Sequence, residues 1–386
     1  MSKINENFLE LQKSYLFATV AQKVEEFKRK NPNKKLINLG IGDVTLPLPK
    51  AVVDAMKKAC EEMQYKETFR GYGPELGYNF LKEKIIQNDY LAKGISFETN
   101  EVFISDGINS DICNISEIFD INNKVAIPDP VYPAYLDTNV IEGRSGKYHI
   151  TNYENIVYLV ANITNNFIPE IPKTKVDLIY LCYPNNPTGT VLTKTELKEW
   201  IKYAKENNAI ILFDAAYEAY VTDENVPHSI YEIEGAKDVA IEFKSFSKSA
   251  GFTGIRCAYT IVPKELYGYT KKGDKVQLNE LWSRRQNTKF NGVSYITQRG
   301  AEATYLKEAQ NEIKKNIKYY LNNANMIKNG LKKVGLKAYG AINSPYIWLK
   351  VPNEKTSWQF FDELLENIGV IGIPRKRFWS KWRRIF

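Results

Sequence analysis

Apolar residues in the middle of the chain occur in short continuous runs that alternate with polar, helix-like stretches. Residues 176–182 and 209–213 are two such runs, each with the length of a buried strand. Between them, residues 194–205 place charged side chains at positions i and i+4, as is typical of a solvated helix face within residues 193–207. Strands and helices alternating in this way predict a mostly parallel, doubly wound α/β sheet.

The same reading extends to both ends of the chain. It predicts strands over 36–41, 101–105 and 124–127, a helix over 49–63 that begins at a proline, and mostly long helix over 280–328. That helix would lead to a smaller α+β domain containing residues 336–351 and a helix around 358–367. The predicted division is an N-terminal arm with part of the small domain in 1–48, a large domain in 49–290 and a small C-terminal domain in 291–386.

One lysine stands among small hydroxyl residues in the segment Ser-Phe-Ser-Lys-Ser-Ala-Gly-Phe-Thr-Gly-Ile-Arg, residues 245–256. Ser245, Ser247 and Arg256 offer two hydroxyls and a planar cation, which together suit a phosphate dianion. Cationic and dipolar neighbours favour the neutral amine of Lys248, the form that attacks a carbonyl carbon. The plain alternative is an exposed lysine on a serine- and glycine-rich loop.

Asp214 follows the apolar run 209–213 and therefore lies at the carboxyl end of a predicted strand. Open α/β sheets bind their ligands at this edge. A carboxylate there can hold a pyridinium nitrogen protonated, and Lys248 follows 34 residues later. A structural aspartate at a strand end is the alternative interpretation.

These motifs in combination resemble those of the fold-type I pyridoxal-phosphate-dependent aminotransferases: Asn-Pro-Thr-Gly at 186–189, Asp-x-x-Tyr at 214–217 and the segment 245–256. Strings at 38–43, 70–74 and 128–133 narrow the resemblance to the LL-diaminopimelate aminotransferases of lysine biosynthesis. The resemblance covers residues from about 8 to about 374. It implies a large domain that binds pyridoxal 5′-phosphate in a cytoplasmic homodimer with shared active sites. The implied reaction is amino transfer between glutamate and tetrahydrodipicolinate, giving 2-oxoglutarate and LL-2,6-diaminopimelate.

The resemblance also implies roles for particular residues. Lys248 and Asp214 would be catalytic, Lys248 as the amine that joins the cofactor and moves a proton, and Asp214 as the partner of the ring nitrogen. The implied cofactor-binding residues are Tyr72 (toward the other subunit), Ile108, Asn109, Tyr132, Asn186, Asp214, Tyr217, Ser245, Ser247, Lys248, Arg256 and Asn291. The implied substrate-binding residues are Tyr15, Gly42, Asn109, Tyr132, Asn186 and Asn291. The family usually has a lysine where this chain has Asn109, which removes part of the expected charge.

Composition excludes several other classes of protein. Of the 386 residues 44% are hydrophobic and 25% charged, as in a globular protein, and no apolar stretch is long enough to span a membrane. The net charge of +8 comes from interspersed acids and bases, so nucleic acid is not an expected partner. The chain has only two histidines, which argues against a histidine-based metal site, and no metal is expected. Four cysteines without metal or disulfide spacing predict buried reduced thiols of a cytoplasmic protein: Cys60, Cys113, Cys182 and Cys257.

The last twelve residues, 375–386, depart from the family pattern. They form a basic aromatic stretch where the family has a Gly-rich run followed by an arginine that binds the substrate carboxylate. Back-translation of this stretch, shifted by one base, can read Gly-Ser-Gly-Phe-Gly-Gln-Asn-Gly-Glu-Gly-Phe. We therefore hypothesise a single-base frameshift near codon 375.

Two other functions are compatible with the sequence. One is a fold-type I aminotransferase for another amino acid, such as aspartate or an aromatic one, because substrate choice depends on side chains outside the motifs. The other is an inactive truncated product or a non-enzymatic descendant, which the altered residues 375–386 favour and the intact Lys248, Asp214 and Arg256 oppose.

Overall fold

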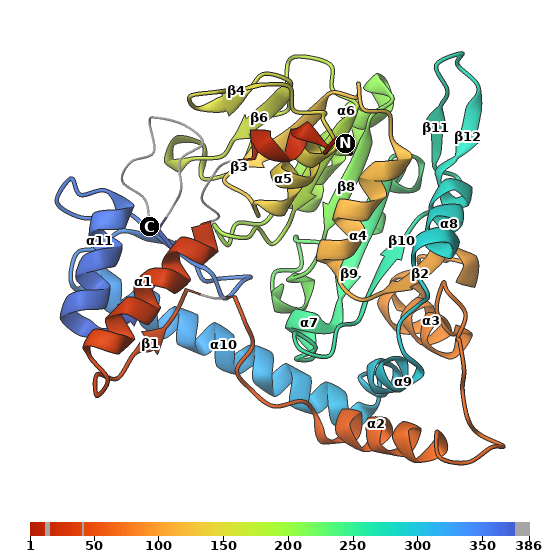
Figure 1. The fold of residues 1–386 in the computed structure, drawn as a ribbon, viewed down its shortest axis with the longest axis horizontal. Coiled ribbons are helices and arrows are strands. Elements are labelled where there is room, and N and C mark those ends of the chain that lie inside the picture. Colours follow the sequence, from red (N-terminus) through yellow and green to blue (C-terminus); the bar gives the residue numbers. More distant parts are fainter. Residues whose placement is uncertain (12–15, 41, 375–386) are drawn as a thin grey trace.

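The centre of the molecule is a seven-stranded sheet in the order β2-β10-β9-β8-β7-β3-β6, as seen in a computed structural model that describes residues 1–11, 16–40 and 42–374 (Figure 1). Strand β10 is antiparallel to both of its neighbours, and the ladder from β9 to β6 is parallel throughout. The predicted mostly parallel sheet is thus confirmed. Its strands are β2 (Val102–Ser105), β3 (Val125–Asp129), β6 (Ile156–Val160), β7 (Leu178–Cys182), β8 (Ile210–Asp214), β9 (Ala240–Ser245) and β10 (Ala258–Ile261).

Side chains of these strands alternate between two hydrophobic clusters, one on each face of the sheet. In β7, Leu178 and Tyr180 belong to one cluster, and Ile179 and Leu181 belong to the other. Because successive side chains of a strand point to opposite faces, a strand covered on both faces is apolar throughout its length. The cluster of Ile179 and Leu181 is covered by helices α2 (Lys50–Glu62), α3 (Asn79–Ile85), α6 (Lys194–Asn207) and α9 (Tyr295–Ala303). The cluster of Leu178 and Tyr180 is covered by α4 (Ile108–Asn114), α5 (Ala134–Ile141) and α8 (Leu278–Lys289).

The N-terminal and C-terminal parts of the chain meet in a smaller cluster beside the main sheet. Strand β1 (Ile37–Asn38) pairs in parallel with β15 (Val370–Ile371). Val20 and Val24 of α1 (Leu16–Lys30) pack with Phe361 of α11 (Ser357–Glu363). Figure 1 shows α10 (Lys307–Lys333) running from this cluster toward α2 and α9. The domain limits predicted from the sequence stay a prediction.

Short paired strands complete the chain. The described residues form three hairpins outside the main sheet: β4 (Tyr148–His149) with β5 (Asn152–Tyr153), β11 (Tyr267–Tyr269) with β12 (Lys275–Gln277), and β13 (Ala338–Gly340) with β14 (Ile347–Leu349). The segment between β13 and β14 reaches the main sheet, as described below.

Two predicted elements differ from those observed. The stretch 280–328, predicted to be mostly long helix, is mostly helical but divided into α8, α9 and α10. Helix α8 ends where Phe290 becomes extended, with a φ of −144° and a ψ of 129°, and Gly292 then takes a φ of +81°. Ser294 starts α9 by accepting a hydrogen bond from the Thr297 amide at 3.2 Å. The strand predicted over 36–41 shortens to the two residues of β1.

The prediction of four buried cysteines is half right. Cys182 and Cys257 are buried, Cys113 is intermediate, and Cys60 is exposed. Cys60 lies on α2 directly after the buried Ala59, so it falls on the outward side of an amphipathic helix. The predicted frameshift in residues 375–386 and the side chain of Tyr15 lie outside the described residues.

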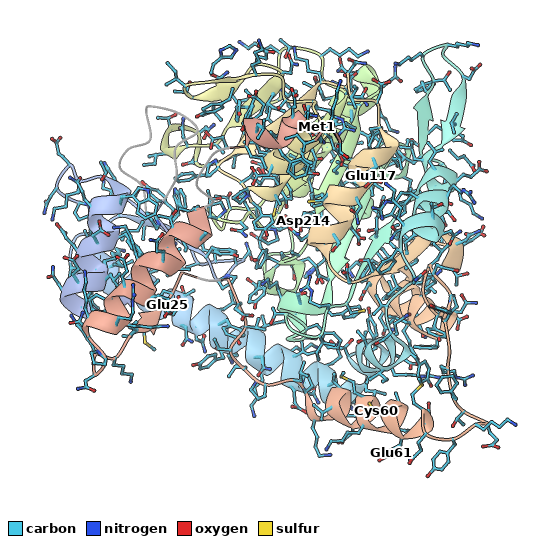
Figure 2. All side chains as sticks on the ribbon, in the orientation of Figure 1. Met1, Glu25, Cys60, Glu61, Glu117 and Asp214 are labelled. Atoms are coloured by element: carbon cyan, nitrogen blue, oxygen red, sulfur yellow. The ribbon has the colours of Figure 1, made fainter. Side chains whose placement is uncertain are left out.

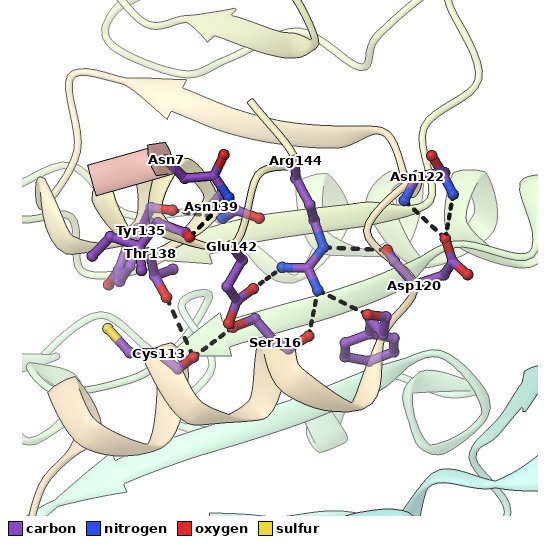
Figure 3. A network of polar contacts seen from close by, with 12 residues as sticks. Asn7, Cys113, Ser116, Asp120, Asn122, Tyr135, Thr138, Asn139, Glu142 and Arg144 are labelled. Atoms are coloured by element: carbon purple, nitrogen blue, oxygen red, sulfur yellow. Dashed lines mark hydrogen bonds and ion pairs between the residues drawn. The ribbon is translucent and has the colours of Figure 1, made fainter. Parts of the chain in front are cut away.

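A buried arginine fixes α5 against the segment that follows α4 (Figure 3). The Arg144 guanidinium is ion-paired with Glu142 and donates to the carbonyl oxygens of Asp120 at 3.2 Å, Ser116 at 2.5 Å and Phe119 at 2.8 Å. A buried charge is tolerated where its donors are satisfied in this way. Since α5 also carries Tyr135, this anchor helps to fix one side of the site described next.

Within residues 1–11, 16–40 and 42–374, no helix is long and apolar enough to cross a membrane. The same described part of the chain contains no group of three or more His, Cys, Asp and Glu residues that could hold a metal ion.

Candidate active site

Four strands of the parallel ladder, together with β2, which runs in the same direction, end at one edge of the sheet, and the predicted site residues follow them. Asp214 is the last residue of β8, and Lys248 lies on α7 (Phe246–Ser249), directly after β9. Asn186 and Tyr132 follow β7 and β3, and Gly107 follows β2. Figure 2 shows Asp214 near the centre of the molecule. Parallel topology therefore gathers segments that are far apart in the sequence.

Asp214 is a buried carboxylate with two donors. The Tyr135 hydroxyl donates to its Oδ2 at 2.5 Å, and the Ala216 amide donates to its Oδ1 at 2.9 Å. Burial raises the pKa of Asp214 to about 6, whereas these two hydrogen bonds and the charge of Lys248 oppose the rise. An acid in this environment is ready to share a proton with a basic ring nitrogen, and such a partner would favour its ionised form.

Lys248 lies among the other predicted groups. Burial lowers its pKa, Arg256 lowers it further, and Asp43 and Asp214 act in the opposite direction. Its Nζ donates a hydrogen bond to the carbonyl oxygen of Gly42, a predicted substrate contact. The alternative given above, an exposed lysine on a serine- and glycine-rich loop, is therefore wrong, because Lys248 lies on α7 and is partly buried.

The predicted phosphate-binding residues surround the start of α7. Ser245 caps this helix by accepting a hydrogen bond from the Ser247 amide at 2.9 Å. Arg256 adopts a φ of +72° and lies against Gly107, where a Cβ would collide with its Nη2. Gly107 in turn begins α4, so the guanidinium lies close to the amides of Ile108 and Asn109 in the first helical turn. Two hydroxyls, one cation and free amides form a donor set for an anion.

Aromatic side chains form the remaining wall. Tyr217 is buried, and its hydroxyl is hydrogen-bonded to the hydroxyl of Tyr346. The Tyr132 ring meets the Tyr135 ring edge-on at 5.9 Å between centroids. The Tyr220 hydroxyl donates to the backbone oxygen of Lys248 at 3.2 Å, which ties the segment after Asp214 to α7. Asn186 is half-buried at the end of β7.

Three predicted residues lie on the surface of the single chain. Tyr72 is 94% exposed, and Asn109 and Asn291 are also exposed. The loops of Tyr72 and Asn291 are neighbours, because a Cβ on Gly292 would lie 2.9 Å from the carbonyl oxygen of Pro74. Tyr72, whose predicted role crosses a subunit interface, thus shares one region of the surface with Asn291.

Sequence reasoning missed two members of the site, Tyr135 and Tyr346. Tyr135 lies three residues after Tyr132 at the start of α5, so its helical position beside a predicted site residue could have indicated it. Tyr346 comes from the hairpin β13–β14, and no local motif marks it.

Comparison with known proteins identifies the family. The family model for aminotransferase class I and II matches residues 34–385. The chain belongs to this aminotransferase family. Its members use pyridoxal phosphate, and this aminotransferase has the fold-type I architecture that the sequence predicted.

Comparison with individual relatives shows which members of the family the chain is similar to. LL-diaminopimelate aminotransferase of Parabacteroides distasonis is 55% identical over 374 residues, which are 97% of this chain and 91% of the relative. The protein of that name from Methanosphaera stadtmanae is 56% identical over 377 residues, 97% of this chain and 92% of the relative. The solved structure of L,L-diaminopimelate aminotransferase from Chlamydomonas reinhardtii has a TM-score of 0.91 at 39% identity, covering 100% of this chain and 93% of the other. The predicted resemblance is confirmed, and this aminotransferase is an enzyme.

Proposed function

We propose that this aminotransferase transfers an amino group between glutamate and tetrahydrodipicolinate, forming 2-oxoglutarate and LL-2,6-diaminopimelate for lysine biosynthesis. The observation that carries the proposal is the identity of about 55% to relatives of that activity over 97% of the chain. The site itself is suited to amino transfer because a buried acid, a lysine and an anion-binding donor set converge at one edge of the sheet.

The donor set fits pyridoxal 5′-phosphate, which when bound supplies an electron sink for the bond that breaks at the substrate Cα. Asp214 would contact the ring nitrogen, Tyr217 and Asn186 the ring oxygen, and Tyr132 the ring face. Ser245, Ser247, Arg256 and the amides of Ile108 and Asn109 would bind the phosphate. Gly107 supports this fit, because any larger residue would displace Arg256.

Lys248 would both hold the cofactor covalently and move a proton between the substrate Cα and the C4′ atom of the cofactor. A general base must be neutral when it accepts a proton. Burial and Arg256 lower the pKa of Lys248, which increases the neutral fraction near pH 7. Its hydrogen bond to Gly42 holds Nζ on the side where the substrate would enter.

The substrate contacts proposed from the family are Tyr15, Gly42, Tyr132, Asn186, Asn109 and Asn291. Asn109 replaces a lysine that the family usually has, so its amide would contribute hydrogen bonds without a charge.

The frameshift near codon 375 also stays a proposal, and resequencing that part of the gene from an independent template tests it.

We also propose a cytoplasmic homodimer in which Tyr72 and Asn291 complete the site of the other subunit. The exposure of both residues and the contact between their loops support this arrangement. An apolar groove of about 430 Å³ with Leu48, Met56, Ile255 and Ile296 in its lining offers further surface for association.

A substrate panel tests the proposed reaction. Purified protein reconstituted with pyridoxal phosphate is assayed with 2-oxoglutarate and LL-diaminopimelate, aspartate or phenylalanine as amino donor. The proposal predicts glutamate formation from LL-diaminopimelate with a kcat/KM at least about a hundredfold above the other two. Preference for aspartate or phenylalanine would favour the broader alternative, and absence of any transamination would reject both.

A further inference from the structure

The hydroxyl of Tyr346 lies among residues of the proposed site, although it comes from a distant part of the chain. We propose that Tyr346 is a positioning residue that acts through Tyr217: its hydroxyl donates to the Tyr217 hydroxyl, so that the Tyr217 proton is directed to the ring oxygen of the cofactor. This inference rests on the proposed cofactor site and adds a residue to it.

Three observations place the Tyr346 hydroxyl in the site. It is hydrogen-bonded to Tyr217, and the two rings meet edge-on at 5.0 Å between centroids with an interplanar angle of 73°. A Cβ on Gly42 would lie 2.5 Å from the Tyr346 oxygen. Burial raises the pKa of Tyr346, the hydrogen bond with Tyr217 opposes part of the rise, and the nearby Tyr132 and Asp214 add to it. The hydroxyl therefore stays protonated and remains able to donate.

The backbone around Tyr346 passes unusually close to the Asn-Pro-Thr-Gly motif. Gly189 and Gly340 have φ values of +70° and +76°. A Cβ on Gly189 would lie 2.9 Å from the Tyr346 carbonyl oxygen, and a Cβ on Gly340 would overlap the same oxygen. The Tyr346 carbonyl also accepts a hydrogen bond from the Ala341 amide at 2.7 Å. The glycine of the motif is thus needed for the close approach of this loop.

Buried polar contacts hold the loop in that place. Asn343 Oδ1 accepts hydrogen bonds from the Thr222 amide at 2.8 Å and from the Thr222 hydroxyl at 3.0 Å. Ser344 Oγ accepts from the Tyr346 amide at 3.1 Å. Both acceptors are buried, so the cost of breaking these bonds is high. The loop therefore gives the Tyr346 hydroxyl a fixed position relative to Tyr217.

The direction of the hydrogen bond decides what Tyr346 contributes. A hydroxyl has one proton, so Tyr217 can donate to the cofactor only if it accepts from Tyr346. Chains of hydrogen bonds strengthen one another in a site of low dielectric constant. Without the Tyr346 hydroxyl, Tyr217 becomes a weaker and less oriented donor, and the anionic form of the ring oxygen is stabilised less.

The test compares Tyr346→Phe with a matched control, Tyr339→Phe. Tyr339 lies on β13 of the same hairpin and packs edge-on against Phe167 at 5.0 Å, away from the Tyr217 hydroxyl. Two quantities are measured without turnover: the dissociation constant of pyridoxal phosphate and the pH midpoint of the absorption change of the bound cofactor. Tyr346→Phe should weaken cofactor binding about three- to tenfold and raise the pH midpoint. Tyr339→Phe should change neither quantity.

A double variant separates action through Tyr217 from a general structural effect. If Tyr346 acts through Tyr217, Tyr217→Phe/Tyr346→Phe should bind the cofactor no more weakly than Tyr217→Phe alone. This double variant also leaves no unpaired hydroxyl between the rings, so it tests the proposal even if Tyr346→Phe folds poorly. Additive effects, or an unchanged pH midpoint in Tyr346→Phe, would overturn the inference. If the wild-type protein bound no pyridoxal phosphate, the proposed function itself would be rejected.

Discussion

The predicted site residues fall into two sets that differ in their surroundings. One set lies at the edge of the sheet, and the other lies on the loops of Tyr72 and Asn291. At the sheet edge, Asp214 and Lys248 are within each other's electrostatic influence and have donors or acceptors inside the chain. Tyr72 and Asn291, by contrast, are exposed on neighbouring loops. The end of a strand holds a side chain in place through contacts within one subunit. A side chain on an exposed loop is held in place only when a ligand or another subunit packs against that loop.

The two regions differ in the kind of side chain that each supplies to the proposed site. Asp214 and Lys248, two groups whose pKa values are shifted by burial, lie at the sheet edge. The exposed loops carry a tyrosine and an asparagine, residues suited to hydrogen bonding with a bound ligand. We therefore propose that proton transfer takes place at the sheet edge and that a second subunit completes the binding site.

The largest effect is expected from Lys248→Ala. It removes the amine that would hold the cofactor and carry the proton, so kcat/KM should fall by about four orders of magnitude or more. Steady-state kinetics with LL-diaminopimelate measure the loss. Lys50→Ala, which removes an exposed lysine on α2, is the control and should retain full activity. Comparable activity of the Lys248→Ala and Lys50→Ala variants would show that Lys248 is not a catalytic residue.

Asp214→Asn should lower kcat/KM by about two to three orders of magnitude, because the amide cannot hold the ring nitrogen protonated. Its effect on stability should have the opposite sign. In the cofactor-free protein the pKa of Asp214 is about 6, above its ordinary value of 3.8. The folded state thus binds more protons between these values, and wild-type stability falls as pH rises through that window.

The neutral asparagine avoids this loss. At pH 7 the cofactor-free Asp214→Asn protein should therefore be more stable than wild type by up to about 3 kcal/mol, and near pH 4 the difference should nearly disappear. Urea unfolding at both pH values measures it. A variant that is less stable than wild type at pH 7 would contradict the assigned cost of burying this carboxylate.

Tyr135→Phe should have a smaller effect. It removes the donor to Asp214 Oδ2 and keeps the ring, which stacks on Tyr180 at 5.2 Å. Loss of a hydrogen bond that favours the charged carboxylate should raise the pKa of Asp214 and lower kcat/KM about tenfold. The control is Tyr180→Phe, which removes a buried hydroxyl from the other ring of the stack. Equal losses of activity in both variants would indicate a packing effect only.

Mixed dimers test the role of the exposed loops. When Lys248→Ala and Tyr72→Ala proteins are unfolded, mixed in equal amounts and refolded together, half of the dimers should contain one subunit of each kind. If Tyr72 acts across the interface, one site in each mixed dimer is intact, and the mixture should recover about a quarter of wild-type activity. Activity no greater than the mean of the two separate variants would place Tyr72 in the site of its own subunit.

The parts of the fold that could be predicted are those with a strong local pattern. The apolar runs before Asp214 and Tyr183 became β8 and β7, and Thr193 begins α6 with a capping box that includes Glu196. The prediction of mostly long helix over 280–328 did not locate the breaks between α8, α9 and α10, because helical periodicity continues across short interruptions. Gly292 and Ser294 were the local evidence for a break.

The site followed the same rule. Asp214, Lys248, Ser245 and Arg256 could be predicted because each belongs to a short motif next to a strand end. Tyr346 could not be predicted, because its place depends on a hairpin nearly 100 residues beyond Lys248 and on its contact with Gly189. Long-range packing of this kind leaves no signal in a local pattern.

The most direct test of the central claim is to locate the cofactor on the chain. The protein is saturated with pyridoxal phosphate, reduced with borohydride, digested and analysed by mass spectrometry. Our account predicts that the reduced cofactor is attached to Nζ of Lys248 in the peptide containing residues 245–256, and that prior addition of an amino-acid substrate diminishes the label. Attachment to another lysine, or no attachment at all, would contradict the assignment of the sheet edge as the active site.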